Sequence, residues 1–212
     1  MSKTKTQYAC SDCGATSPKW AGQCHDCGAW NALTEVVIEK VNPRLKGYAG
    51  ETASLITPLE NVSVEQTLRI PTGLSELDRA LGGGLAPGMV VLIGGDPGIG
   101  KSTLLLQAAS MVQGGHALYI TGEESLSQVS LRAQRLDIQQ SNIDLLAETN
   151  VEKMIAMASK AKPKLMVVDS IQTLYTETLQ SAPGSVSQVR ESAALLLRFA
   201  KHHQIPLYLV GH

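Results

Sequence analysis

The stretch GGDPGIGKST, residues 94–103, decides the fold expected of this chain. An apolar run, MVVLI (89–93), leads into it, and a second one, LLLQAASMV (104–112), follows it. The stretch matches the phosphate-loop (Walker A) pattern GxxxxGK[ST] between a predicted strand and a predicted helix, which is the context that this pattern requires. Its glycines let backbone N–H groups point toward phosphate oxygens, and the start of the helix adds partial positive charge. The alternative is a glycine-rich turn that binds nothing.

Each residue of this loop has an expected role in nucleotide binding. Lys101 is expected to reach the β- and γ-phosphates, and the Ser102 hydroxyl to ligate Mg2+. Thr103 is expected to support the α-phosphate. The predicted cofactors of the core are therefore ATP or ADP together with Mg2+. The other loop residues assigned to nucleotide binding are Gly95, Asp96, Pro97, Gly98, Ile99 and Gly100.

Acidic residues follow two other predicted strands. Asp169 ends the run LMVVD, where a carboxylate can hold the water shell of Mg2+ beside Ser102. Glu123 and Glu124 follow YIT, where one of them can orient and deprotonate the attacking water. Glu123 is the preferred catalytic residue, with Lys101 and Asp169, and Glu124 is assigned to nucleotide binding. The alternatives are an ordinary strand-end aspartate and two acids that favour the dipole of the next helix.

Strands and helices alternate from residue 67 onward, which predicts an α/β fold with a mostly parallel sheet covered on both faces. The sequence divides into a cysteine module (1–33), a linker (34–66) and the core (67–212). The last predicted helix opens with a capping-box pattern, Ser185 and Gln188. The predicted strands are 89–94, 116–121, 142–148, 164–169 and 205–212, and the predicted helices are 72–81, 102–113, 125–136, 151–161 and 185–203.

The four cysteines of the chain form two CxxC pairs near its start. Two such pairs predict a tetrahedral thiolate cage for a structural zinc ion. Two disulfides or two redox pairs are the alternatives. Disulfides would fit a protein with an export signal, and redox pairs would fit a surrounding βαβ pattern, but the sequence shows neither feature. Trp20 and Trp30 are expected to pack over the site, since so small a module has little other core. The predicted zinc ligands are Cys10, Cys13, Cys24 and Cys27.

The overall composition points to no particular partner. The formal net charge is −1, so the chain lacks the strongly basic footprint that by itself indicates nucleic-acid binding. No apolar run reaches the roughly 20 residues of a membrane span. A cytoplasmic protein without a membrane partner is expected.

The combination of motifs resembles the bacterial RadA (Sms) family of DNA repair proteins. The resemblance rests on the pattern YxCxxCG…WxGxCxxCxxWN in residues 8–31, IPTGLSELDRALGGGLxPG (70–88), GGDPGIGKSTLLLQ (94–107) and YITGEES (119–125). It implies a RecA-like P-loop ATPase core that binds single-stranded and branched DNA and promotes branch migration in homologous recombination. It also implies a hexameric ring, and recombinase RecA or a replicative helicase as a partner. His212 matches a strand end where such proteins carry a sensor of the γ-phosphate, and an ordinary strand-end histidine is the alternative.

The resemblance leaves some questions open. Members of the family continue into DNA-contacting loops and a Lon-like domain that this chain lacks, so a C-terminally truncated ATP hydrolase is expected. Whether this part of the protein hydrolyses ATP or forms rings is left open by the sequence. One alternative is a KaiC-like signalling ATPase, which shares the paired acidic residues but has no cysteine module. A zinc-mediated interaction module on a non-hydrolysing scaffold is the other alternative. Arg132 and Arg135 are expected either on a solvated helix face or beside the adenine.

Overall fold

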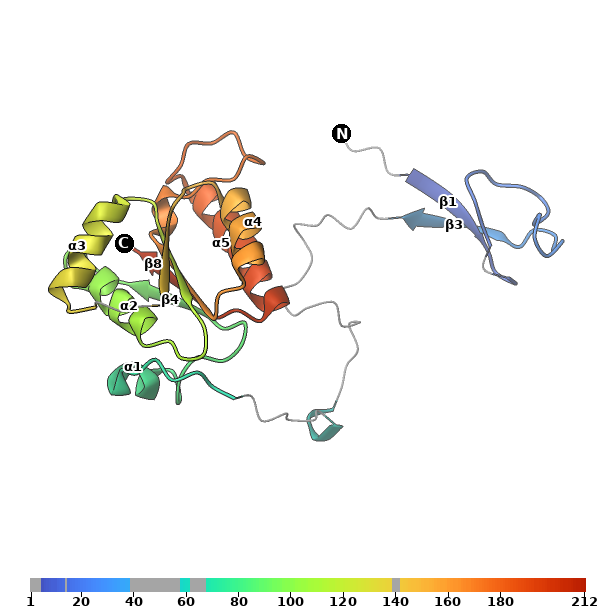
Figure 1. The fold of residues 1–212 in the computed structure, drawn as a ribbon. Helices are drawn as coiled ribbons and strands as arrows, with labels where there is room; N and C mark the ends of the chain where they lie inside the picture. Colours follow the sequence, from blue (N-terminus) through green and yellow to red (C-terminus); the bar gives the residue numbers. More distant parts are fainter. Residues whose placement is uncertain (1–4, 14, 39–57, 62–67, 139–141) are drawn as a thin grey trace. The chain divides into compact units, whose positions relative to one another are not determined.

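The computed structural model describes residues 5–13, 15–38, 58–61, 68–138 and 142–212 (Figure 1). The chain separates into two compact units, residues 1–47 and residues 48–212. Most of the predicted linker, namely 39–57 and 62–66, lies outside the described residues, as does residue 67 of the predicted core. A short 3-10 helix, η2 (Leu59–Asn61), falls between these two segments.

The first unit is a three-stranded antiparallel sheet of order β2-β1-β3. β1 (Lys5–Cys10) pairs with β2 (Thr16–Ser17) and along its whole length with β3 (Leu33–Ile38). Because of this pairing, the first unit includes all of β3 and extends beyond residue 33, the predicted end of the cysteine module. The small core that the strands enclose contains Cys10, Cys24, Ala32 and Leu33.

The second unit is built on five parallel strands, as the alternation of the sequence predicts. Their spatial order is β4-β8-β7-β5-β6, so β8 lies between the strand that enters the phosphate loop and the strand that carries Asp169. The strands are β4 (Val90–Gly94), β5 (Ala117–Thr121), β6 (Ile143–Ala147), β7 (Leu165–Asp169) and β8 (Leu207–Gly211).

Helices cover both faces of this sheet (Figure 1). Alternate strand residues point to opposite faces. One set of them packs with α2 and α3 around Tyr119 and Val167, and the other packs with α4 and α5 around Ile120 and Val168. The helices are α1 (Ser75–Ala80), α2 (Lys101–Ser110), α3 (Leu126–Arg135), α4 (Val151–Ala161) and α5 (Val186–His203), with the 3-10 helix η3 (Ile171–Thr173) after β7.

The parallel arrangement brings the predicted site residues to one edge of the sheet. All five strands run in the same direction, so their carboxyl ends meet there. The register pairs Gly94 with Gly211 across β4 and β8, and Thr121 with Asp169 across β5 and β7. The phosphate loop, His212, Asp169 and the two glutamates therefore follow neighbouring strand ends. In open α/β sheets, ligands bind at this edge where the strand order reverses.

The predicted capping box at the start of α5 forms only in part. The Ser185 side chain accepts a hydrogen bond from the Gln188 amide, as the pattern predicts. The Gln188 side chain, however, is buried and turns away from the helix start, where its Oε1 accepts from the Thr176 amide and its Nε2 donates to the carbonyl of Ser181. None of the helices in the described part of the chain combines the length and apolar character needed to cross a membrane.

Candidate nucleotide and zinc sites

The phosphate loop joins the end of β4 directly to the start of α2. Gly100 is the N-cap residue of α2 and has a φ of 97°, in the left-handed region that favours glycine. Gly95 has a φ of 149°, and a Cβ atom added there would lie 2.6 Å from Cδ1 of Ile99. A side chain at either position would thus distort the loop. The predicted binding residues Gly95 to Thr103 lie on this loop and in the first turn of α2.

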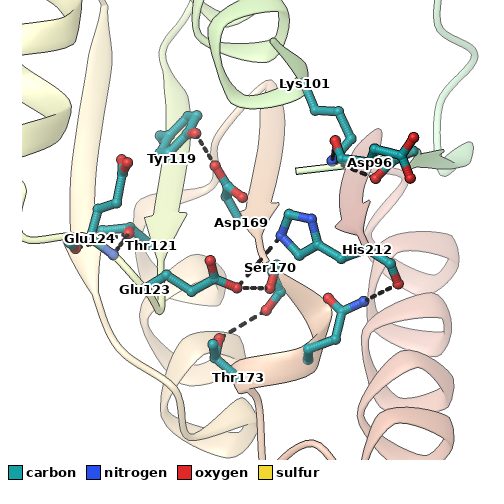
Figure 2. Close-up of polar contacts among 12 residues, drawn as sticks. Asp96, Lys101, Tyr119, Thr121, Glu123, Glu124, Asp169, Ser170, Thr173 and His212 are labelled. Carbon is teal, nitrogen blue, oxygen red and sulfur yellow. Dashed lines mark hydrogen bonds and ion pairs between the residues drawn. The ribbon is translucent and has the colours of Figure 1, made fainter. Parts of the chain in front are cut away.

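Lys101 is the first residue of α2, and its side chain folds back over the loop. Its Nζ donates hydrogen bonds to the carbonyl oxygens of Gly95 at 2.7 Å and Asp96 at 2.8 Å (Figure 2). The residue is only 6% exposed. A buried ammonium needs such partners, and phosphate oxygens could replace the two carbonyls with a stronger charged interaction. The helix start and this ammonium together can hold an anion.

Asp169 is the last residue of β7, and a buried tyrosine orients its carboxylate. The Tyr119 hydroxyl on neighbouring β5 donates to Oδ2 of Asp169 at 2.6 Å (Figure 2). Burial of the phenol, together with the adjacent Asp169 charge, raises the pKa of Tyr119 far above its usual value. The phenol therefore stays protonated and remains a donor at physiological pH. Tyr119 was not predicted as a site residue. Its position on β5 next to β7 would have pointed to it, but the pairing of these two strands is not visible in the sequence.

Glu123 belongs to a cluster formed by three strand ends. The buried Ser170 hydroxyl donates a hydrogen bond to Oε1 of Glu123, and Nε2 of His212 lies 3.7 Å from the same oxygen (Figure 2). Gln172 donates to the backbone carbonyl of His212 at 3.1 Å. The Thr173 hydroxyl donates to the backbone carbonyl of Ser170 at 2.9 Å. The structure thus brings together Glu123 and His212, two predicted residues far apart in sequence, through Ser170, which the sequence analysis did not single out.

Glu124 points in a different direction from Glu123 (Figure 2). Its Oε1 forms an ion pair with Nη2 of Arg132 on α3, and the two side chains are 34% and 17% exposed. Its backbone amide donates to the Thr121 hydroxyl at 3.0 Å. Arg132 therefore does not lie on a solvated helix face, because it pairs with Glu124. This ion pair connects the end of β5 to α3, and the nucleotide-binding role of Glu124 stays a prediction.

The four cysteines of the first unit converge on one point. Their sulfur atoms all lie within 4.8 Å of one another. The Sγ atoms of Cys10 and Cys27 are 3.6 Å apart, and those of Cys13 and Cys24 are 3.7 Å apart. Sulfurs at ~2.3 Å from a tetrahedral zinc ion would be about 3.8 Å from one another, whereas a disulfide needs about 2 Å. The arrangement therefore fits Zn2+ and excludes the disulfide alternative.

Backbone amides favour the thiolate form of one of the four cysteines. Hydrogen bonds from the N–H of Cys27 and, to a lesser extent, of Asp26 lower the pKa of the Cys24 thiol to about 7. At Cys13 and Cys27, amide hydrogen bonds at Ala15 and Ala29 act in the same direction, but contacts with the other thiols and burial raise the pKa overall. Hydrogen bonds from amides stabilise a thiolate, which is the form that binds zinc. The turn that aims these amides is closed by hydrogen bonds from the Cys24 amide to Ala29 and from the Gly28 amide to Cys24.

Removing zinc is expected to unfold the first unit and leave the second unit folded. The first unit has a core of few residues, so the metal supplies much of its folding free energy. Both tryptophans of the chain lie in this unit, whereas all the α-helices of the described chain lie in the other. The near-ultraviolet circular dichroism of the tryptophans, which depends on fixed surroundings of the rings, should therefore be lost on chelation while the far-ultraviolet helix signal persists. A tryptophan spectrum unchanged after confirmed loss of zinc would contradict this expectation, and Cys27→Ser should reproduce the chelated state.

The strand order and the site define the class of protein. A phosphate loop after β4, an acidic residue at the end of β7 and a strand inserted between these two strands characterise a RecA-like P-loop core, here accompanied by a four-cysteine zinc ribbon. Comparison with family models supports the metal-binding part and assigns the core to a family without giving its function. Residues 8–35 match the model described as a rubredoxin metal binding domain. The chain belongs to the family described as a family of unknown function (DUF7125), whose model matches residues 69–194.

The chain is similar over its whole length to bacterial proteins named DNA repair protein RadA. It is 55% identical to the protein of Pseudomonas aeruginosa over 215 residues, which cover 100% of the chain and 47% of that protein. It is 48% identical to the protein of Escherichia coli, covering 98% of the chain and 47% of the relative, and 45% identical to that of Bacillus subtilis, covering 100% and 47%. The resemblance to the RadA family is thus confirmed, and the chain spans about half the length of these relatives.

Proposed function

We propose that this chain is the nucleotide-binding part of a DNA-dependent ATPase that acts in DNA repair and homologous recombination. In this proposal the protein binds single-stranded DNA and promotes branch migration of recombination intermediates. The observation that carries the ATPase part is Lys101 folded over the glycine loop at the same sheet edge as Asp169. The names of the relatives support the DNA repair part. A ring of six subunits, and RecA or a replicative helicase as a partner, belong to the same proposal.

The proposed reaction is the attack of water on the γ-phosphate of ATP. Lys101 and the amides of residues 95–101 bind the phosphate tail and neutralise charge that develops in the transition state. The Ser102 hydroxyl and the Asp169 carboxylate hold Mg2+, with Asp169 oriented by Tyr119. Glu123 orients the attacking water and accepts its proton. His212, beside Glu123, is proposed to sense the γ-phosphate.

Ser170 is proposed as a positioning residue for Glu123, because its hydroxyl fixes one oxygen of the Glu123 carboxylate. Ser170→Ala should lower kcat about tenfold or more with little change in KM, since a hydrogen bond to a charged group contributes about 1.5–3 kcal/mol. Steady-state kinetics would measure this split.

Ser192→Ala is the matched control for Ser170→Ala. Ser192 is equally buried, lies on α5, and its hydroxyl has no hydrogen-bond partner among the described residues. Removal of that hydroxyl should therefore leave kcat unchanged. Equal kcat values for the two variants would contradict the positioning role of Ser170.

The experiment that tests the proposed function compares ATP binding and hydrolysis with and without single-stranded DNA. DNA should raise the rate of hydrolysis. Failure to bind ATP at all would reject the ATPase proposal. This chain could bind ATP without hydrolysing it, and a chain extended toward the length of its relatives could then hydrolyse ATP. That pair of results would favour an ATPase that needs further residues over an inactive scaffold. Hydrolysis that DNA does not change would favour the signalling alternative.

A further inference from the structure

The two tryptophans of the chain lie on the surface of the first unit. Trp20 is 57% exposed and Trp30 is 72% exposed, so the expectation that they pack over the zinc site is wrong. Among the first-unit residues whose burial the structure describes, these two tryptophans are the exposed large apolar side chains. Exposing two indole rings costs solvation free energy that a small module can recover by binding a partner.

The backbone holds these two rings close to one another. A Cβ atom added to Gly22 would lie 3.9 Å from Cη2 of Trp20 and 4.0 Å from Cζ3 of Trp30, so both rings reach the same glycine. Trp30 forms an antiparallel bridge with Gln23, and the Asn31 amide donates to the carbonyl of Gly22 at 2.8 Å. The same backbone segment continues into the turn that carries Cys24 and Cys27, so the support of the two rings is connected to the zinc site.

The size of this aromatic surface distinguishes among possible partners. The exposed parts of two tryptophans amount to roughly 200–300 Å², since one such side chain presents about 150–250 Å². A stable protein interface buries about 800 Å² on each partner, around a larger apolar centre. A nucleobase needs only one aromatic face, and it stacks there without regard to sequence. The surface is therefore matched to planar bases better than to a folded protein.

One cationic side chain beside Trp20 can contact a phosphate. Lys19 is exposed beside Trp20 and is the only charged residue of the segment 15–24. The segment 25–34, which contains Trp30, carries one charged residue, the exposed Asp26. A phosphate backbone passing Trp20 on the side of Lys19 would meet a favourable charge.

We infer that Trp20 and Trp30 form a stacking platform for the bases of single-stranded nucleic acid. This inference rests on the DNA-binding part of the proposed function and gives it a surface on the zinc module, separate from the nucleotide site. Lys19 assists as a phosphate contact. Zinc maintains the platform, because the turns that support both indoles also carry its ligands.

The test is a titration of the zinc-loaded, nucleotide-free chain of 212 residues with a thymidine oligonucleotide. Because Trp20 and Trp30 are the only tryptophans, their fluorescence reports directly on the platform, and stacked bases should quench it. Trp20→Ala and Trp30→Ala should each weaken binding about fivefold to 150-fold, which corresponds to the usual range for loss of one stacked base. Trp30→Phe keeps a ring and should retain most of the affinity.

Leu68→Ala is the control for loss of an exposed apolar side chain, because Leu68 is 88% exposed and lies in the second unit. It should bind the oligonucleotide as the wild type does, and zinc content should confirm that each variant is folded. If the oligonucleotide bound without changing the tryptophan emission, and both alanine variants bound it with wild-type affinity, the stacking platform would be overturned. The proposal that the protein binds DNA would remain. No binding by the wild type would overturn both, whereas the ATP site is tested separately through Lys101.

Discussion

Lys101→Ala will abolish ATP binding at physiological concentrations and remove any hydrolysis. The ammonium is the cation that folds over the phosphate loop, where it contacts the carbonyls of Gly95 and Asp96. Loss of one preorganised donor to a developing oxyanion costs about 10²–10³-fold in rate, and the lost ground-state charge pair weakens binding as well. Calorimetric titration with ATP and Mg2+ would measure the binding loss, and phosphate release would measure the rate.

The control for this substitution is Lys201→Ala. Lys201 is exposed near the end of α5, and its loss changes the net charge equally. It should bind ATP as the wild type does. If Lys101→Ala bound and hydrolysed ATP as well as Lys201→Ala, the phosphate loop would not be the nucleotide site.

Glu123→Gln will retain ATP binding and lose hydrolysis, by about 10²–10⁴-fold, because the amide cannot accept the proton of the attacking water. The substitution preserves the size of the side chain and an oxygen that can accept from Ser170. Binding and single-turnover hydrolysis, measured on the same protein, would separate the two effects.

Glu124→Gln is the matched comparison, and it should behave in the opposite way. It removes one charge of the ion pair with Arg132, which is largely buried, so the protein should unfold at a lower temperature by the equivalent of about 1 kcal/mol. Its hydrolysis should remain close to that of the wild type. Loss of hydrolysis in Glu124→Gln with normal activity in Glu123→Gln would exchange the two proposed roles.

Local patterns were sufficient to predict most elements of the core. All five parallel strands and the helices between them lie close to their predicted ranges, and α4 matches its prediction at both ends. Apolar periodicity and glycine-rich turns act within a few residues, so the sequence displays them directly. The four zinc ligands were predictable for the same reason, since CxxC spacing brings two sulfurs together without help from the rest of the chain.

Contacts between distant segments were not predictable in this way. The order of the strands places β8 between β4 and β7, and this order brings His212 to the oxygen of Glu123 that Ser170 also contacts. The hydrogen bond from Tyr119 to Asp169 depends on the register of β5 and β7. The exposure of Trp20 and Trp30 depends on which turns of the zinc ribbon face solvent.

Two nearly identical stretches of sequence show which features depend on the local sequence and which depend on tertiary contacts. SLSQV (125–129) and SVSQV (185–189) both begin a helix, and in both the serine side chain accepts a hydrogen bond from the amide of the glutamine. The Gln128 side chain completes its capping box by accepting from the Ser125 amide at 2.8 Å. The Gln188 side chain is 1% exposed and binds the Thr176 amide and the Ser181 carbonyl instead.

The sequence by itself therefore determined where both helices begin, because a serine cap involves only neighbouring residues. Only the tertiary structure decided where each glutamine points. The chain after β7 passes over the start of α5 and presents backbone groups that are buried and need hydrogen bonds, whereas the start of α3 is open to solvent. A buried polar group without a partner costs more free energy than an exposed cap contributes, so Gln188 satisfies the loop.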